Sequence, residues 1–104
     1  MSRGPDAATQ LARALLAGAA ASGCPVRVDA ASCERWASAT FTGARHMLNL
    51  SGDAGPAIED WLAGLPEAEF ALRGHLVADL GVEAVRREGG TVTALVEALT
   101  VEER

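Results

Sequence analysis

The chain contains no lysine among its 104 residues, so all nine of its basic residues are arginines. This absence excludes a Schiff-base lysine, a lysine nucleophile and the phosphate-binding lysine of a P-loop. The codon bias of a GC-rich genome is a sufficient explanation for the missing residue. Chemistry that requires lysine is excluded whatever the cause of its absence.

Positive charge is also scarce, since the nine arginines are outnumbered by fourteen acidic residues and the net charge is −5. Binding of nucleic acid needs a concentrated positive patch that neutralises phosphates, and none is present in the sequence. No stretch approaches the ~18 consecutive apolar residues that a membrane span needs. We therefore expect neither a nucleic acid nor a membrane as partner.

Cysteine is limited to Cys24 and Cys33, which lie nine positions apart. This spacing fits no zinc motif, and the two histidines, His46 and His75, add no known pattern of metal ligands. Two isolated thiols without a disulfide framework are typical of a reducing compartment. The sequence therefore predicts no metal, no cofactor and a cytoplasmic protein.

The hydrophobic fraction of 49% and the charged fraction of 22% are typical of an ordinary globular domain. A chain of this length buries roughly 65% of the surface of its unfolded form, which is enough for one core. We expect residues 1–104 to form a single domain.

Two helices are predicted. Residues 6–22 begin at Asp6, which can cap the first amides, and carry an apolar stripe that includes Leu11 and Leu15. Residues 54–65 begin after Asp53 with Pro56 in the first turn, and Pro66 ends them.

The alternation of apolar and polar residues predicts strands at 26–28, 35–41, 44–50, 69–82 and 91–101, with turns at Thr42-Gly43 and Gly89-Gly90. The resulting fold class is α+β, with two helices on one face of a mostly antiparallel sheet of four or five strands, in the order α-β-β-β-α-β-β. The predicted core consists of Leu11, Leu15, Phe41, Leu48, Leu50, Ile58, Trp61, Leu62, Phe70, Leu72, Leu76 and Leu80.

The two histidines are predicted to differ. His46 lies among apolar neighbours, so we expect a neutral core residue with a hydroxyl or backbone partner. His75 lies in the longest predicted strand, where strict alternation puts it on the same face as Arg73 and Asp79. If the hairpin packs beside that strand, Trp36 and Arg45 join them on this face.

These five residues, Trp36, Arg45, Arg73, His75 and Asp79, are the candidate binding site. Arginine offers a forked set of donors and tryptophan a flat apolar surface, so a protein segment or a small acidic ligand would suit them. No catalytic residue is assigned, because neither Ser38 nor Ser51 has the glycine spacing of a nucleophile elbow.

Two helices are too few to cover both faces of such a sheet, so the sequence favours a homodimer formed sheet to sheet or edge to edge. The leading hypothesis is a non-catalytic interaction or ligand-binding module. The alternative is a small enzyme in which His75 acts as general acid or base, with Arg73 and Arg45 binding an anionic substrate. A concave pocket holding His75 and an arginine would favour the enzyme, whereas a flat apolar face would favour the interaction module.

Overall fold

A computed structural model describes residues 6–103 of the chain. Its elements follow in the order α1 (Ala7–Ala21), β1 (Val26–Ala37), β2 (Thr42–Asp53), α2 (Pro56–Gly64), the 3₁₀ turn η1 (Leu65–Glu67), β3 (His75–Glu88) and β4 (Thr91–Glu102). The four strands form one antiparallel sheet in the spatial order β1-β2-β4-β3. No helix in residues 6–103 is both long and apolar enough to span a membrane.

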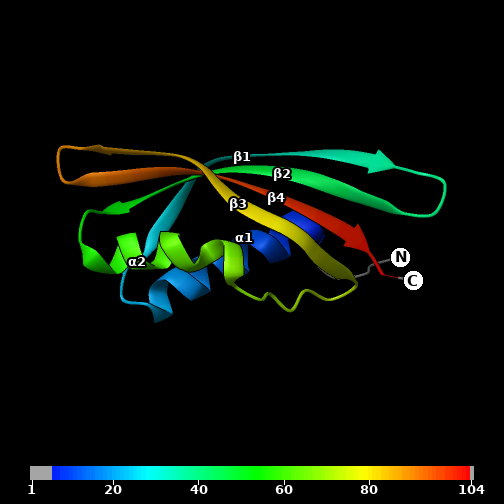
Figure 1. Cartoon of the computed structure of the whole chain (residues 1–104), viewed down its shortest axis with the longest axis horizontal. Coiled ribbons are helices and arrows are strands. Elements are labelled where there is room, and N and C mark those ends of the chain that lie inside the picture. Colours follow the sequence, from blue (N-terminus) through cyan, green and yellow to red (C-terminus); the bar gives the residue numbers. More distant parts are fainter. Residues whose placement is uncertain (1–5, 104) are drawn as a thin grey trace.

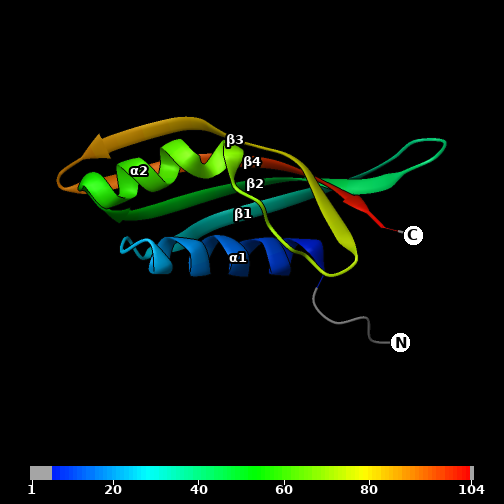
Figure 2. The same ribbon diagram turned by 60° about the horizontal axis from the view of Figure 1, so that its bottom comes forward.

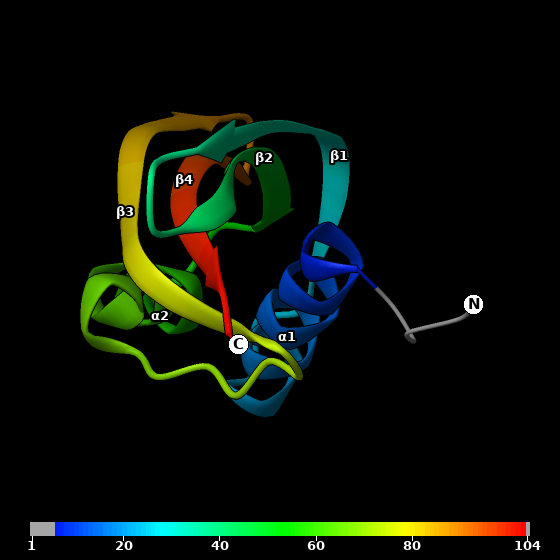
Figure 3. The same ribbon diagram turned by 90° about the vertical axis from the view of Figure 1, so that its right-hand side faces the viewer.

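The sheet and the two helices form two layers (Figure 1). Both helices lie side by side against the same face of the sheet (Figure 2), and the sheet curves over them when it is viewed end-on (Figure 3). We call the helix-covered face the inner face and the opposite one the outer face. The predicted α+β class, with two helices on one face of an antiparallel sheet, is confirmed.

The first helix forms as predicted. The Asp6 carboxylate accepts a hydrogen bond from the Thr9 amide at 2.9 Å, which satisfies a donor that the helix itself leaves free. Leu11, Leu15 and Ala19 repeat along one side and are completely buried against the sheet. The second helix starts later than predicted, at Pro56, with Gly55 instead of Asp53 at its N-cap.

The chain has one strand fewer before α2 than predicted, because residues 26–37 form a single strand. The turn that follows occupies residues 38–41, where the Ser38 amide and hydroxyl both donate to the Phe41 carbonyl, at 2.7 and 3.2 Å. The prediction of a turn at Thr42-Gly43 was therefore wrong, and the order is α-β-β-α-β-β. The hairpin register changes with it: Cys33 pairs with His46, and Ala37 with Thr42.

Close packing is what requires a glycine at position 43, and not the turn that was predicted there. A Cβ atom placed there would overlap the Thr100 carbonyl oxygen and lie 2.7 Å from the ring of Trp36. Only a residue without a side chain fits between that ring and the neighbouring strand.

Strand β3 also differs from the prediction, starting at His75 and continuing to Glu88. Its register against β4 shifts between Val77 and Asp79 and again between Val82 and Ala84. Each shift is a β-bulge, in which an extra residue reverses the alternation of faces. Two side chains on either side of such a bulge that strict alternation would place on the same face therefore lie on opposite faces.

Most of the predicted core is buried, including Leu11, Leu15, Leu48 and Leu50. Trp61 and Phe70 are half-buried against that core. The predictions for Phe41 and Leu76 were wrong, since these side chains are 52% and 55% exposed. Phe41 lies in the turn between β1 and β2, and Leu76 pairs with Val101 on the outer face.

Candidate functional site

The outer face brings three of the five predicted site residues together. Directly paired residues of an antiparallel sheet point to the same side. One row of such pairs crosses all four strands and consists of Glu34, Arg45, Leu99 and Asp79. The adjacent row consists of Trp36, Gly43, Val101 and Leu76. Trp36, Arg45 and Asp79 therefore lie on one surface, as predicted.

We call the side chains of these two rows, other than Gly43, the outer patch: Glu34, Trp36, Arg45, Leu76, Asp79, Leu99 and Val101. Leu76 is exposed, and Trp36, Leu99 and Val101 are half-buried. Two shallow depressions meet there, and Arg45 and Leu99 line both of them. The centre of the outer patch is thus apolar around a single guanidinium group.

Arg45 takes part in none of the ion pairs within residues 6–103, which are Arg27–Asp29, Arg35–Glu102 and Arg87–Glu59. Glu34 and Asp79, at the two ends of its row, are likewise outside those pairs. The outer patch therefore presents one cation and two carboxylates, none of them neutralised by ion pairing within the described chain. Two further carboxylates, those of Glu83 and Glu97, line the depression that contains Asp79.

His75 and Arg73 do not belong to this surface. His75 pairs with Glu102 and lies on the inner face, because the bulge after Val77 separates it from Asp79. The prediction that His75 and Asp79 share a face was therefore wrong. Arg73 lies in the turn before β3, where its backbone amide and carbonyl bind the Gln10 side chain at 2.6 and 3.0 Å. His75, Arg73 and Arg45 thus do not form the anion site of the enzyme hypothesis.

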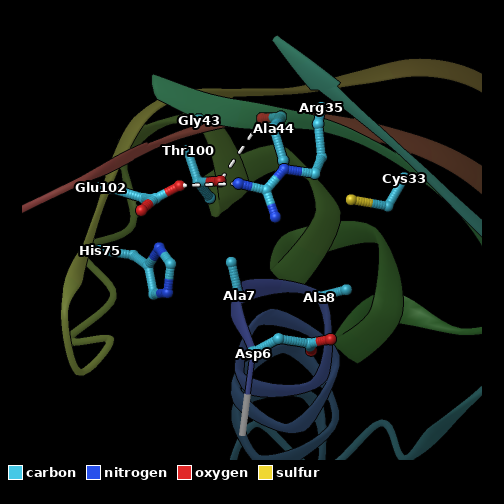
Figure 4. Close-up of a pocket in the computed structure, with 10 residues that line it drawn as sticks. All are labelled: Asp6, Ala7, Ala8, Cys33, Arg35, Gly43, Ala44, His75, Thr100 and Glu102. Carbon is cyan, nitrogen blue, oxygen red and sulfur yellow. Dashed lines mark hydrogen bonds and ion pairs between the residues drawn. The ribbon is translucent and has the colours of Figure 1, made fainter. Parts of the chain in front are cut away.

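His75 instead lines a cavity between the first turn of α1 and the inner face of the sheet (Figure 4). The cavity has a volume of about 140 Å³. Its walls come from α1 and all four strands: Asp6, Ala7, Ala8, Cys33, Arg35, Gly43, Ala44, His75, Thr100 and Glu102. The arginine beside His75 is Arg35, which pairs with Glu102 at 3.4 Å. A concave pocket that holds His75 and an arginine is the observation expected of the enzyme alternative, although the arginine is Arg35 and not Arg45 or Arg73.

The sequence did not point to Arg35 or Glu102 as partners of His75. Arg35 and Cys33 are two residues apart on one strand and so share a face, but this signal exists only if 26–37 is recognised as one strand. The proximity of His75 and Glu102 follows from the register of β3 against β4, which no residue motif encodes.

His46 is a satisfied core residue, as predicted. It is 1% exposed, and its Nε2 lies 2.9 Å from the Thr100 hydroxyl. That hydroxyl donates to the Ala44 carbonyl at 3.4 Å, so its oxygen accepts from Nε2–H of a neutral His46. Burial lowers the pKa of His46 below its ordinary value of 6.5; the nearby His75 lowers it further, and Asp6 opposes both.

This lowered pKa predicts a loss of stability on acidification. Below the ordinary value of 6.5 the unfolded chain binds a proton that the folded chain does not, so the free energy of unfolding falls as the pH drops. One such group contributes at most about 1.4 kcal/mol per pH unit. This loss of stability is measured by urea unfolding of the unmodified chain and of His46→Gln at about pH 7.5 and pH 5, which lie on either side of the ordinary pKa.

The variant retains an amide that can donate to Thr100 but does not titrate, so its stability should decline less over this interval. Equal declines in the two proteins would show that His46 is not the group responsible.

Cys24 and Cys33 are both free thiols, one buried beside α1 and the other exposed on β1. Within residues 6–103, no three histidine, cysteine, aspartate or glutamate side chains converge in a way that could hold a metal ion. No family model, curated protein sequence or solved structure matches this chain.

Proposed function

We propose that this protein is a non-catalytic interaction module that pairs with a second copy of itself through the outer patch. The observation that carries the proposal is the outer patch itself, an apolar surface drawn from all four strands around an arginine that forms no ion pair within residues 6–103. The helices cover the inner face, and no element among residues 6–103 covers the outer one (Figure 3). Burial of such a surface against a partner removes its apolar area from water.

The charges of the outer patch favour a second copy as the partner. A two-fold interface brings the same surface from both chains together, so the surface must be complementary to itself. Arg45 supplies a cation, and Glu34 and Asp79 supply carboxylates at both ends of its row. One copy therefore offers both signs of charge to the other, so Arg45 of each copy can meet a carboxylate of its partner.

The contribution of Arg45 to the dimer can be tested by reversing its charge. We expect Arg45→Glu to raise the dissociation constant of the dimer by roughly tenfold or more, because each interface then loses two cations and gains two further carboxylates. Sedimentation velocity over a range of protein concentrations measures this constant.

Arg13→Glu is the matched control, since it changes the net charge equally at an exposed position of α1. This control should leave the dissociation constant within a factor of about two, because exposed charges away from an interface interact weakly. Equal weakening by both variants would indicate general charge repulsion and would contradict an interface at the outer patch.

A further inference from the structure

An open groove lies between α1 and α2, the two helices that lie side by side in Figure 2. Its volume of about 550 Å³ is within the range of roughly 300–1,000 Å³ that is usual for ligand clefts. The groove shares no lining residue with the inner cavity at His75. Because the outer patch is on the other face of the sheet, the proposed dimer leaves the groove accessible.

Small residues at intervals of four form both sides of the groove. Ala14, Gly18 and Ser22 lie along α1, and Gly64 and Ala68 lie on the α2 side. Residues four apart occupy the same side of a helix, so the α1 positions extend over about 12 Å. A groove of that length accommodates about two turns of a bound helix.

The larger apolar side chains of the groove are those of Trp61, Leu65 and Phe70. Trp61 and Phe70 are only half-buried. The Trp61 indole reaches across to α1, where its Nε1 atom lies 3.5 Å from the position that a Cβ atom added at Gly18 would take. An apolar group that enters the groove removes the exposed parts of both rings from water.

The charged groups that line the groove are all acidic. Asp60 and Glu69 are exposed side chains of the lining, and no arginine among residues 6–103 belongs to it. Neither carboxylate takes part in an ion pair within the described chain. The groove is therefore complementary to a cationic partner and opposes lipid headgroups or phosphates. A second copy is disfavoured as well, because two-fold contact here would bring the same carboxylates of both chains together.

We propose that this groove binds a basic, amphipathic segment of another protein. The apolar side chains of that segment lie over Trp61 and Phe70, and its lysine or arginine side chains lie beside Asp60 and Glu69. Docking of an amphipathic helix into an apolar groove is a common mode of peptide recognition, in which side chains one turn apart anchor the helix. The small residues on both sides of the groove leave room for such a helix.

A peptide of the sequence Lys-Leu-Leu-Lys-Leu-Leu-Lys, with blocked termini, is a suitable probe. Two matched peptides replace its lysines by glutamate or its leucines by serine. The chain has two tryptophans, so in an NMR titration of the full chain the indole N–H signal of Trp61 reports on the groove and that of Trp36 on the outer patch. We expect the lysine–leucine peptide to shift the Trp61 signal saturably and to leave Trp36 unchanged. The glutamate peptide should bind at least tenfold more weakly, and the serine peptide should cause no saturable shift.

Four results would overturn the proposal. Equal affinity for the lysine–leucine peptide and either matched peptide would show that charge or apolar contact has no part in binding. A response of Trp36 instead of Trp61 would place the peptide on the outer patch. A shift of the Trp61 signal when the chain alone is concentrated would assign the groove to a second copy. The fourth result is the absence of any saturable shift with the lysine–leucine peptide.

The contribution of the two carboxylates is tested by the double variant Asp60→Asn, Glu69→Gln. It should weaken binding of the lysine–leucine peptide by roughly tenfold, because each exposed ion pair contributes up to about fivefold. The double variant Asp53→Asn, Glu67→Gln is the control, since it makes the same changes at exposed positions outside the groove lining. Equal affinities in the two double variants would contradict the charge complementarity.

The space in the groove is tested separately by adding a side chain to it. Gly64 has helical backbone angles, and a Cβ atom there meets nothing within 4 Å, so Gly64→Leu should fold normally. We expect it to weaken binding of the lysine–leucine peptide by at least tenfold, because the leucine occupies the groove. Ala63→Leu adds the same side chain at an exposed position of α2 outside the lining and should not weaken binding. Equal affinities in these two variants would show that the peptide binds elsewhere.

Discussion

Leu99→Asp is expected to convert the dimer into a monomer. Leu99 lies between Arg45 and Asp79 in the row that crosses the outer patch, and it lines both depressions on that face. A carboxylate at this position would be buried in an apolar interface beside Asp79, without enough cations to neutralise both. We expect the dissociation constant of the dimer to rise by about a hundredfold, the loss associated with a central interface residue.

Leu16→Asp is the matched control for this substitution. Leu16 is half-buried like Leu99 but lies on α1, in the helix layer on the other side of the sheet. Light scattering coupled to size-exclusion chromatography should give a monomer for Leu99→Asp and a dimer for Leu16→Asp. A dimer in both variants would show that the chains associate through a different surface, such as the free edge of β1 or β3.

Gly43→Ala is expected to lower the free energy of unfolding by about 3 kcal/mol, at the upper end of the usual cost of overpacking. The added Cβ atom would meet the carbonyl oxygen of Thr100 and the ring of Trp36, and neither is the far end of a flexible side chain. Relief requires separation of β2 from β4 or displacement of the Trp36 ring. The same substitution should therefore also weaken the dimer, because Trp36 belongs to the outer patch.

Gly64→Ala provides the comparison, since a Cβ atom at that position meets nothing within 4 Å and the backbone there is helical. It should be neutral, or stabilise the fold by up to about 1 kcal/mol. Urea unfolding of both variants tests this contrast. If Gly43→Ala proved as stable as Gly64→Ala, the close approach of Trp36 and Thr100 to Gly43 would be refuted.

The parts of the fold that the sequence predicted well are those encoded by local signals. Asp6 and the stripe containing Leu11 and Leu15 identified α1, and Gly89-Gly90 marked the turn into β4. The burial of His46 followed from its apolar neighbours. Each signal lies within a few residues of the element that it specifies.

The errors arose where one residue changes the alternation of a strand. The bulges near Ala78 and Glu83 have no residue signature, yet the one near Ala78 places His75 on the inner face and Asp79 on the outer one. Gly43 resembles a turn glycine, although the ring of Trp36 is what requires it. The inner cavity was missed for the same reason, because its lining depends on the register between strands.

The central claim is that the outer patch holds two copies of the chain together, and the mass of the unmodified protein in solution tests it most directly. Sedimentation equilibrium at micromolar concentrations should give twice the chain mass of 10.7 kDa and show dissociation only on dilution. A mass of 10.7 kDa that persists at high micromolar concentration would contradict the account.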